Sequence, residues 1–259
     1  MLNRSRLAAS FTLLIAGVAG FAAYYVGVLT RTGQLAEASV LETANYKTDP
    51  GFPVNMVSPL SVFLSLGVLV VLTLAVWSIR RALVVLLASL TALFGSQLLK
   101  NVLLDRPVLI DAALTHNSFP SGHMTAIAVL GIALIFAVPA AIRGFMSALV
   151  GFGLSIVALQ VMTAGWHRPS DMVGALALTI GSYALWSLII AHGDNKIALL
   201  GSLVRFLLRV LFGLATLVAL IFLIFAAFTR SDAAIMVGAY AAVIAACIWV
   251  ANRATLLLR

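Results

Sequence analysis

The sequences FPSGH, residues 119–123, and WHRPSD, residues 166–171, interrupt the long apolar runs of this chain. Each stands where an apolar run begins or ends, and each places a histidine where a membrane chain would normally carry an aliphatic residue. An ionisable group at membrane depth costs about 2.5 to 3.5 kcal/mol even on lenient insertion scales. Several such groups at one level therefore indicate a functional site.

The composition is that of an all-α integral membrane protein. Of the 259 residues, 63% are hydrophobic and 9% are charged, and the apolar runs repeatedly exceed the length needed to cross about 30 Å of hydrocarbon. The formal net charge of +8 comes mostly from arginines in short links, which indicates membrane topology and no nucleic-acid partner. The single cysteine, Cys247, excludes an internal disulfide and a cysteine-based metal site.

We predict a bundle of about eight transmembrane helices. The first run follows Arg4 and Arg6 and is too long for a signal peptide, which favours a retained span over a cleaved one. The polar link at residues 31–57 is expected to be an external loop with a turn at its centre, residues 49–51. The expected spans are residues 8–29, 60–79, 82–104, 123–142, 145–165, 171–191, 210–228 and 233–250.

The spans divide into a six-span core, residues 1–200, and a two-span C-terminal hairpin, residues 201–259. We expect the hairpin to pack against the core or to mediate a homo-oligomer. With the amino terminus inside, ten of the sixteen cations fall on the cytoplasmic side: Arg4, Arg6, Arg80, Arg81, Arg143, Lys196, Arg205, Arg209, Arg253 and Arg259. This bias predicts that both termini are cytoplasmic and that the two motifs face the exterior of the cell membrane.

The first motif suits the start of a helix. Ser121 is a candidate cap, and the backbone amides of Gly122 and His123 would point out of the first turn. Free amides and the helix dipole together make such a terminus a receptor for a phosphate group.

The second motif suits a nucleophile. Pro169 favours a helix start, which would place His167 just before the helix and Asp171 in its first turn. An aspartate four residues after a histidine can orient the imidazole and raise its basicity. This arrangement is typical of a nucleophilic histidine.

Simpler interpretations exist for single histidines. At a span boundary a histidine often only caps a helix or reaches the interface, but two histidines together with Arg106 and Asp171 at one face favour a site. We expect His116 to be a solvated loop residue and His192 to belong to a cytoplasmic connector, residues 192–209. A metal site is not favoured, because the spacing matches no common zinc-ligand set.

The order Arg106-Pro, then Pro-Ser-Gly-His, then histidine and aspartate four residues apart resembles the membrane-bound type 2 phosphatidic acid phosphatases, or lipid phosphate phosphatases. The resemblance covers about residues 100–171. It implies that His167 attacks phosphorus, that Asp171 orients it and that His123 protonates the leaving oxygen.

By the same resemblance, Arg106 and the region of Ser121 and Gly122 would hold the phosphoryl oxygens, without a metal or other cofactor. The substrate would be a lipid phosphate or diphosphate, hydrolysed at the external face through a phosphohistidine. Two alternatives stay open: a weakened relative that binds or moves a lipid phosphate among membrane lipids, and a lipid phosphotransferase.

The chain departs from the family pattern in two places. Five residues, rather than six, separate Lys100 from Arg106, and one residue turns a helix by about 100°. The third motif normally begins with Ser-Arg, where this chain has Gln160 and Val161. We expect Lys100 or Arg168 to replace the missing cation. Alternatively, Arg168 anchors the chain at the lipid interface.

Overall fold

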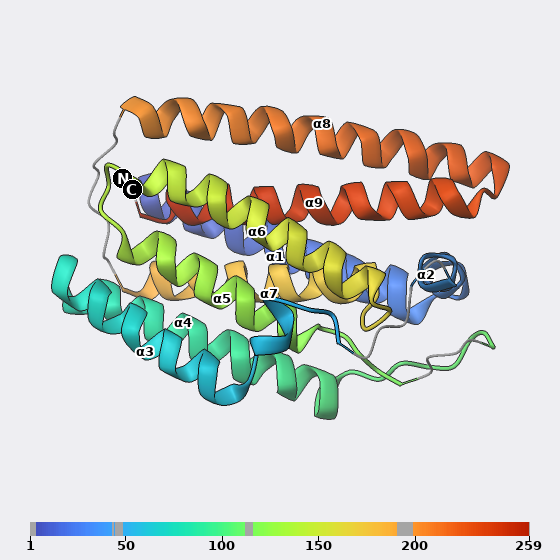
Figure 1. The fold of residues 1–259 in the computed structure, drawn as a ribbon, viewed down its shortest axis with the longest axis horizontal. Coiled ribbons are helices and arrows are strands. Elements are labelled where there is room, and N and C mark those ends of the chain that lie inside the picture. The colour runs from blue at the N-terminus through green and yellow to red at the C-terminus, as the bar shows by residue number, and fades with distance from the viewer. Residues whose placement is uncertain (1–3, 43, 45–48, 112–115, 191–198, 259) are drawn as a thin grey trace.

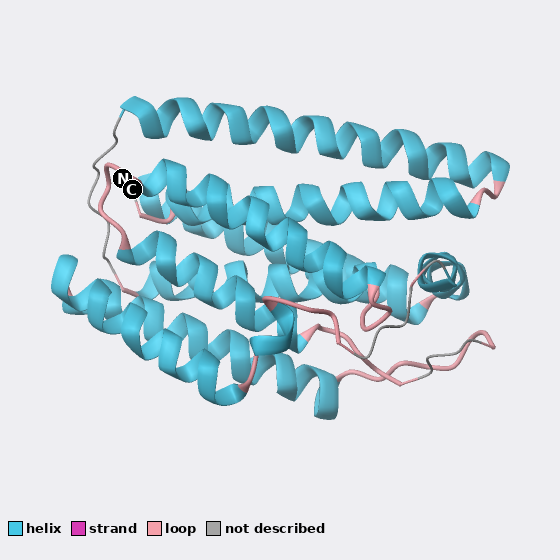
Figure 2. Cartoon of the chain, viewed as in Figure 1, coloured by secondary structure: helices cyan, strands magenta, loops and turns pink. Residues whose placement is uncertain are grey.

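The computed structural model describes residues 4–42, 44, 49–111, 116–190 and 199–258, and in these residues every regular element is helical (Figure 2). The long helices run roughly parallel or antiparallel, whereas α2 lies across them and is seen end-on in Figure 1. In chain order the elements are α1 (Arg4–Ala23), η1 (Tyr24–Val28), α2 (Arg31–Glu42), η2 (Val54–Met56), α3 (Pro59–Val76), α4 (Ile79–Leu98), η3 (Leu99–Leu103), α5 (Gly122–Ala137), α6 (Arg143–Thr163), α7 (Pro169–Ile189), α8 (Leu199–Thr229) and α9 (Asp232–Leu256).

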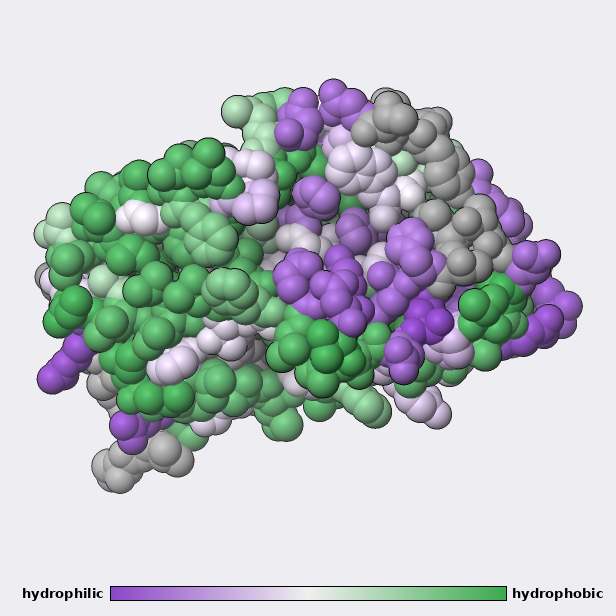
Figure 3. Space-filling model, turned by 90° about the horizontal axis from the view of Figure 1, so that it is seen from below, coloured by the Kyte–Doolittle hydropathy of each residue, from purple (hydrophilic) through white to green (hydrophobic). Residues whose placement is uncertain are grey.

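Seven stretches of the described chain form helices long and apolar enough to cross a membrane: Ser5–Val28, Pro59–Val76, Ile79–Leu103, Arg143–Thr163, Pro169–Ile189, Gly201–Thr229 and Asp232–Leu256. The face of the molecule seen in Figure 3 is largely hydrophobic away from its right-hand end. On the same face, most hydrophilic residues gather towards the end that carries α2 and the link before α5. The chain therefore has the character of an integral membrane protein.

The remaining expected span, residues 123–142, is shorter than predicted. α5 has 16 residues, which corresponds to about 24 Å at 1.5 Å per residue. It ends at Ala137 because Val138 precedes a proline and adopts an extended conformation, with φ −71° and ψ 151°. α5 nevertheless lies inside the bundle, packed against α3, α4, α6 and α7.

We expected the link at residues 31–57 to be a loop, but α2 forms within it. Gln34, Glu37, Val40 and Leu41 are buried on one side of α2, a spacing of three to four residues that is typical of an amphipathic helix. The predicted turn at residues 49–51 is confirmed. The amide of its glycine, at φ +84°, donates to the Oδ1 atom of the aspartate at 2.8 Å.

Two other boundaries differ from the predictions. Arg80 and Arg81 do not end a span but lie in the first turn of α4, where Ser78 caps the helix by accepting from the Arg81 amide at 3.4 Å. α8 begins at Leu199 rather than near residue 210, since no proline interrupts the apolar pattern that runs into it. The rest of the expected connector, including His192, lies outside the described residues.

The C-terminal hairpin has two different helices. α9 belongs to the main hydrophobic core, to which it contributes Val243, Cys247, Val250 and Ala251 alongside residues of α4 to α7. α8 lies on the outside of the bundle, beyond α9 in Figure 1, and most of its large apolar side chains are exposed. Of the two helices in the expected C-terminal hairpin, α9 is thus an integral part of the hydrophobic core.

The chain ends and the two motifs lie at opposite ends of the bundle. Both termini are at one end, whereas α2, the link before α5 and the link before α7 are at the other (Figure 1). The candidate site is therefore assembled at the end remote from the termini.

We predict that Val250→Ala destabilises the protein by about 2 kcal/mol, because Val250 is 1% exposed in the core and truncation leaves a cavity. The matched control is Val218→Ala on α8, where the side chain is 39% exposed and the change should be small. Thermal unfolding in detergent measures both variants. Equal shifts would contradict a core role for α9.

Candidate active site

The two motifs meet at the starts of α5 and α7. Ser121 caps α5 as predicted: its Oγ atom accepts from the Met124 amide at 3.2 Å. Its own amide donates to the carbonyl oxygen of Asp171 at 3.1 Å. The first turns of α5 and α7 are thereby joined through the backbone.

The predicted histidine–aspartate pair is present. Pro169 occupies the first turn of α7, and Asp171 Oδ2 lies 3.1 Å from His167 Nδ1. An ionised carboxylate can only accept, so this contact assigns the proton to Nδ1 and leaves Nε2 with its lone pair. The geometry is that of an oriented imidazole.

Asp171 is 0% exposed, and further donors bind its carboxylate. Oδ2 also accepts from the Ser118 hydroxyl at 2.6 Å and from the Arg168 amide at 3.0 Å. Ser118 in turn accepts from the Arg168 guanidinium at 2.7 Å. Such donors compensate a buried charge for its lost solvation. Here all of them converge on Oδ2, whereas Oδ1 is buried without a hydrogen-bond partner among the described residues.

A pocket of about 470 Å³ lies next to this pair, between α3, α4 and α5. Its polar wall comprises Gln97, Lys100, His123 and His167, and its apolar wall includes Val62, Phe63, Leu93 and Phe94. The rings of His123 and His167 meet edge to face with centroids 6.3 Å apart. Three of the predicted ionisable site residues therefore share one cavity.

Lys100 faces the site despite its short spacing from Arg106. It lies in η3, a π-helical turn at the end of α4, in which the spacing of side chains around the axis differs from that of an α-helix. A Cβ atom built on Gly122 would lie 3.9 Å from Lys100 Nζ and 3.1 Å from Gln97 Nε2. The ammonium group is thus beside the first turn of α5.

The two predicted arginines are placed differently. Arg106 does not line this pocket; its Nη2 atom lies 3.4 Å from Glu37 Oε2, and both side chains are almost fully buried. Arg168, at 2% exposure, sits behind the aspartate with Ser118. This burial does not fit the alternative of a lipid-facing anchor.

The two positions that depart from the family pattern have structural contacts. Val161 is fully buried in the core. The side-chain amide of Gln160 donates to the carbonyl oxygens of Pro50 and Phe52, the latter at 3.0 Å. Gln160 thereby holds the turn in the link at residues 31–57 against α6.

Glu37 is a site neighbour that the sequence reasoning missed. Its Oε1 atom accepts from the Ser170 amide at 3.1 Å, in the first turn of α7. Burial, and next the negative charge of Asp171, raise the pKa of Glu37 from 4.5 to about 7, against the lowering effects of Ser170 and Arg106. The amphipathic spacing of residues 34–41 could have revealed a buried glutamate, but not its partners.

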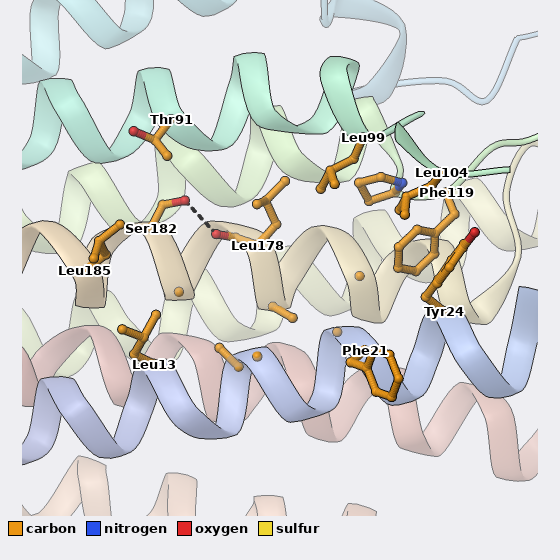
Figure 4. A pocket seen from close by; sticks show the side chains of 17 residues that line it. Leu13, Phe21, Tyr24, Thr91, Leu99, Leu104, Phe119, Leu178, Ser182 and Leu185 are labelled. Carbon is orange, nitrogen blue, oxygen red and sulfur yellow. Dashed lines mark hydrogen bonds between the residues drawn. The ribbon is translucent and has the colours of Figure 1, made fainter. Parts of the chain in front are cut away.

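A second cavity, of about 440 Å³, lies between α1, α4 and α7 (Figure 4). Leu13, Phe21, Leu99 and Leu178 line it, and the Ser182 hydroxyl donates to the Leu178 carbonyl at 2.8 Å. Leu99 lines this groove whereas Lys100 lines the polar pocket, so the two cavities flank the end of α4. The groove is suited to hydrocarbon, and the polar pocket is the candidate active site.

Comparison of the chain with family models, with curated proteins and with solved structures gave no match. Among the described residues, no group of three or more histidine, cysteine, aspartate or glutamate side chains could hold a metal ion. The interpretation of the site thus rests on its own geometry.

The buried carboxyl of Glu37 should make stability depend on pH. A folded-state pKa of about 7, above the ordinary 4.5, means that folding takes up a proton between these values. Its contribution is fully present below pH 4.5 and is lost as pH rises through 7, on the order of 3 kcal/mol in total. We expect the stability of the wild type to fall over this range relative to Glu37→Gln, as measured by thermal unfolding from pH 5 to 8. Parallel pH curves would contradict the assignment.

Proposed function

We propose that the protein hydrolyses a lipid phosphate or diphosphate through a phosphohistidine intermediate. The observation that carries the proposal is the hydrogen bond between His167 Nδ1 and the buried Asp171, beside a pocket shared with His123 and Lys100. A metal-independent phosphoryl transfer needs an oriented imidazole as nucleophile, a second group for acid–base catalysis and a cation. The resemblance of residues 100–171 to lipid phosphate phosphatases supports the same chemistry.

In the first step, the lone pair of His167 Nε2 attacks phosphorus while the bond to the leaving oxygen breaks. His123 donates a proton to that oxygen, and Asp171 stabilises the positive charge that develops on the imidazole. Lys100 and the first-turn amides of α5 bind the phosphoryl oxygens.

In the second step, His123 takes a proton from water, and the water oxygen attacks the phosphorus of the phosphohistidine. The phosphorus–nitrogen bond breaks, its electron pair returns to His167, and inorganic phosphate leaves. Each residue then regains its starting protonation state. In a phosphotransferase, another hydroxyl group would replace the water.

We base the proposed substrate class on the two walls of the pocket. The polar end suits a phosphate group, and the apolar wall, which includes the exposed Phe63 and Phe94, suits a hydrocarbon tail. We propose further that the site faces the cell exterior and that both termini are cytoplasmic, on the distribution of cations between the two ends.

A second candidate is a protein that binds or moves a lipid phosphate without turnover. Two observations favour it: Val161 occupies the core where the family motif carries an arginine, and Arg106 is paired with Glu37. Release of inorganic phosphate from a panel of lipid phosphates by the purified protein distinguishes the two. Release supports the enzyme, whereas saturable binding without release supports the second candidate.

We predict that His167→Ala and His123→Ala each lower kcat at least 1000-fold, because one removes the nucleophile and the other the proton donor. The control is His116→Ala, an exposed histidine in the link before α5, which should keep wild-type activity. A radiolabelled phosphate should be trapped on the wild type but not on His167→Ala. Turnover that survives His167→Ala, or that a chelator abolishes and zinc restores, would rule out this mechanism.

We predict that Lys100→Gln lowers kcat/KM at least 100-fold, since the phosphoryl charge would lose the cation that lines the pocket. Lys100→Arg should recover part of the loss. Arg230→Gln serves as the control, because Arg230 is an exposed cation in the turn between α8 and α9. That turn lies at the same end of the bundle (Figure 1). Near-wild-type efficiency of Lys100→Gln would show that the helix amides suffice for binding.

A further inference from the structure

Glu37 reaches the candidate site from outside the main bundle. It belongs to α2, which lies across the long helices (Figure 1), yet its Oε1 atom accepts from the Ser170 amide at 3.1 Å. Ser170 precedes Asp171 in the first turn of α7. First-turn amides have no partner within their own helix, so a carboxylate is well suited to fix them.

The second oxygen of the same carboxylate fixes the link before α5. Glu37 Oε2 lies 3.4 Å from Arg106 Nη2. Arg106 and Asp171 are the charged groups of the described chain that act on Glu37. One buried side chain therefore connects the two segments from which the site is built.

Close packing keeps Glu37 in this position. A Cβ atom on Gly27 of η1 would lie 2.6 Å from Ser170 Cβ and 2.9 Å from Glu37 Oε1. A Cβ atom on Gly33 of α2 would overlap the backbone of Val26. Because both positions are glycine, α2 and the start of α7 approach η1 closely enough for the carboxylate to reach its partners.

The docking of α2 itself has separate anchors. One turn before Glu37, Gln34 donates to the carbonyl oxygens of Val28 and Pro107, each at 2.7 Å, and accepts from the Leu109 amide at 3.3 Å. None of these contacts involves α7. Gln34 thus attaches α2 to η1 and to the link before α5, whereas Glu37 makes the contact with the first turn of α7.

We propose that Glu37 is a positioning residue, which holds the first turn of α7 so that Asp171 stays aligned with His167. The inference rests on the proposed function and adds a residue outside the motifs to it. Through the Ser170 amide, Glu37 fixes the position of Asp171, which orients His167. Glu37 itself does not line the pocket and does not touch the substrate. A misplacement of about 1 Å at a nucleophile can cost roughly 100-fold in rate.

The test compares Glu37→Ala, Glu37→Gln and Gln34→Ala in the full-length protein, by phosphate release from a lipid phosphate and by thermal unfolding. We expect Glu37→Ala to lower kcat about 100-fold with KM within threefold. Glu37→Gln should regain at least tenfold, because its carbonyl oxygen can still accept from Ser170. Gln34→Ala should lower the melting temperature but keep kcat within threefold. Equal kcat losses in Glu37→Ala and Gln34→Ala, or wild-type kcat in Glu37→Ala, would overturn the proposal.

A second measurement separates this inference from the proposed function. In protein labelled with ¹⁵N-histidine, the ring signals of His167, identified by their absence in His167→Ala, report its tautomer and its contact with Asp171. Glu37→Ala should shift them and Gln34→Ala should not. If the wild type releases no phosphate, the proposed function fails, while these signals still decide the positioning role. Unchanged His167 signals in Glu37→Ala would overturn it.

Discussion

The buried carboxylate of Asp171 is the constraint on which the candidate site depends. An ionised group at 0% exposure inside an apolar bundle would be costly by several kcal/mol without compensating donors. Ser118, the Arg168 amide and His167 supply them to one of its oxygens, Oδ2. Because these donors come from the links before α5 and α7, satisfying one charge brings the two links together. The contact of the Ser121 amide with the Asp171 carbonyl extends this tie to the cap of α5.

The length of α5 then determines the depth of the pocket. Its 16 residues give about 24 Å, less than the roughly 30 Å of a bilayer core. Its C-terminal end lies near the same end of the bundle as the termini (Figure 1), so its first turn falls short of the opposite surface. His123 and Gly122 are therefore recessed, and the side chains of α3 and α4 around them form the apolar wall. A polar site recessed within apolar helices suits a substrate with a charged head and a hydrocarbon tail.

The features that the sequence predicted correctly are local ones. Ser121 as a cap and Asp171 four residues after His167 follow from helix geometry over a few positions. The contact between Glu37 and Arg106 joins residues 69 positions apart, and spacing along the chain holds no information about it. The inward orientation of Lys100 depends on a π-helical turn, which composition does not reveal. The early end of α5 was readable from its proline, and the burial pattern of α2 from its amphipathic spacing.

The distribution of cations explains how a phosphate could be bound with one arginine fewer than in the family pattern. In the proposed site, Lys100 is a compact charge, whereas an arginine would offer a planar pair of donors matched to two oxygens. A lysine therefore neutralises charge but directs few hydrogen bonds. The first-turn amides of α5 are directional donors, and Lys100 Nζ lies beside them, 3.9 Å from where a Cβ atom on Gly122 would stand. In the proposed site, the charge and the directional hydrogen bonds thus come from different elements, so phosphate binding would depend on the junction of α4 with α5 as much as on His167.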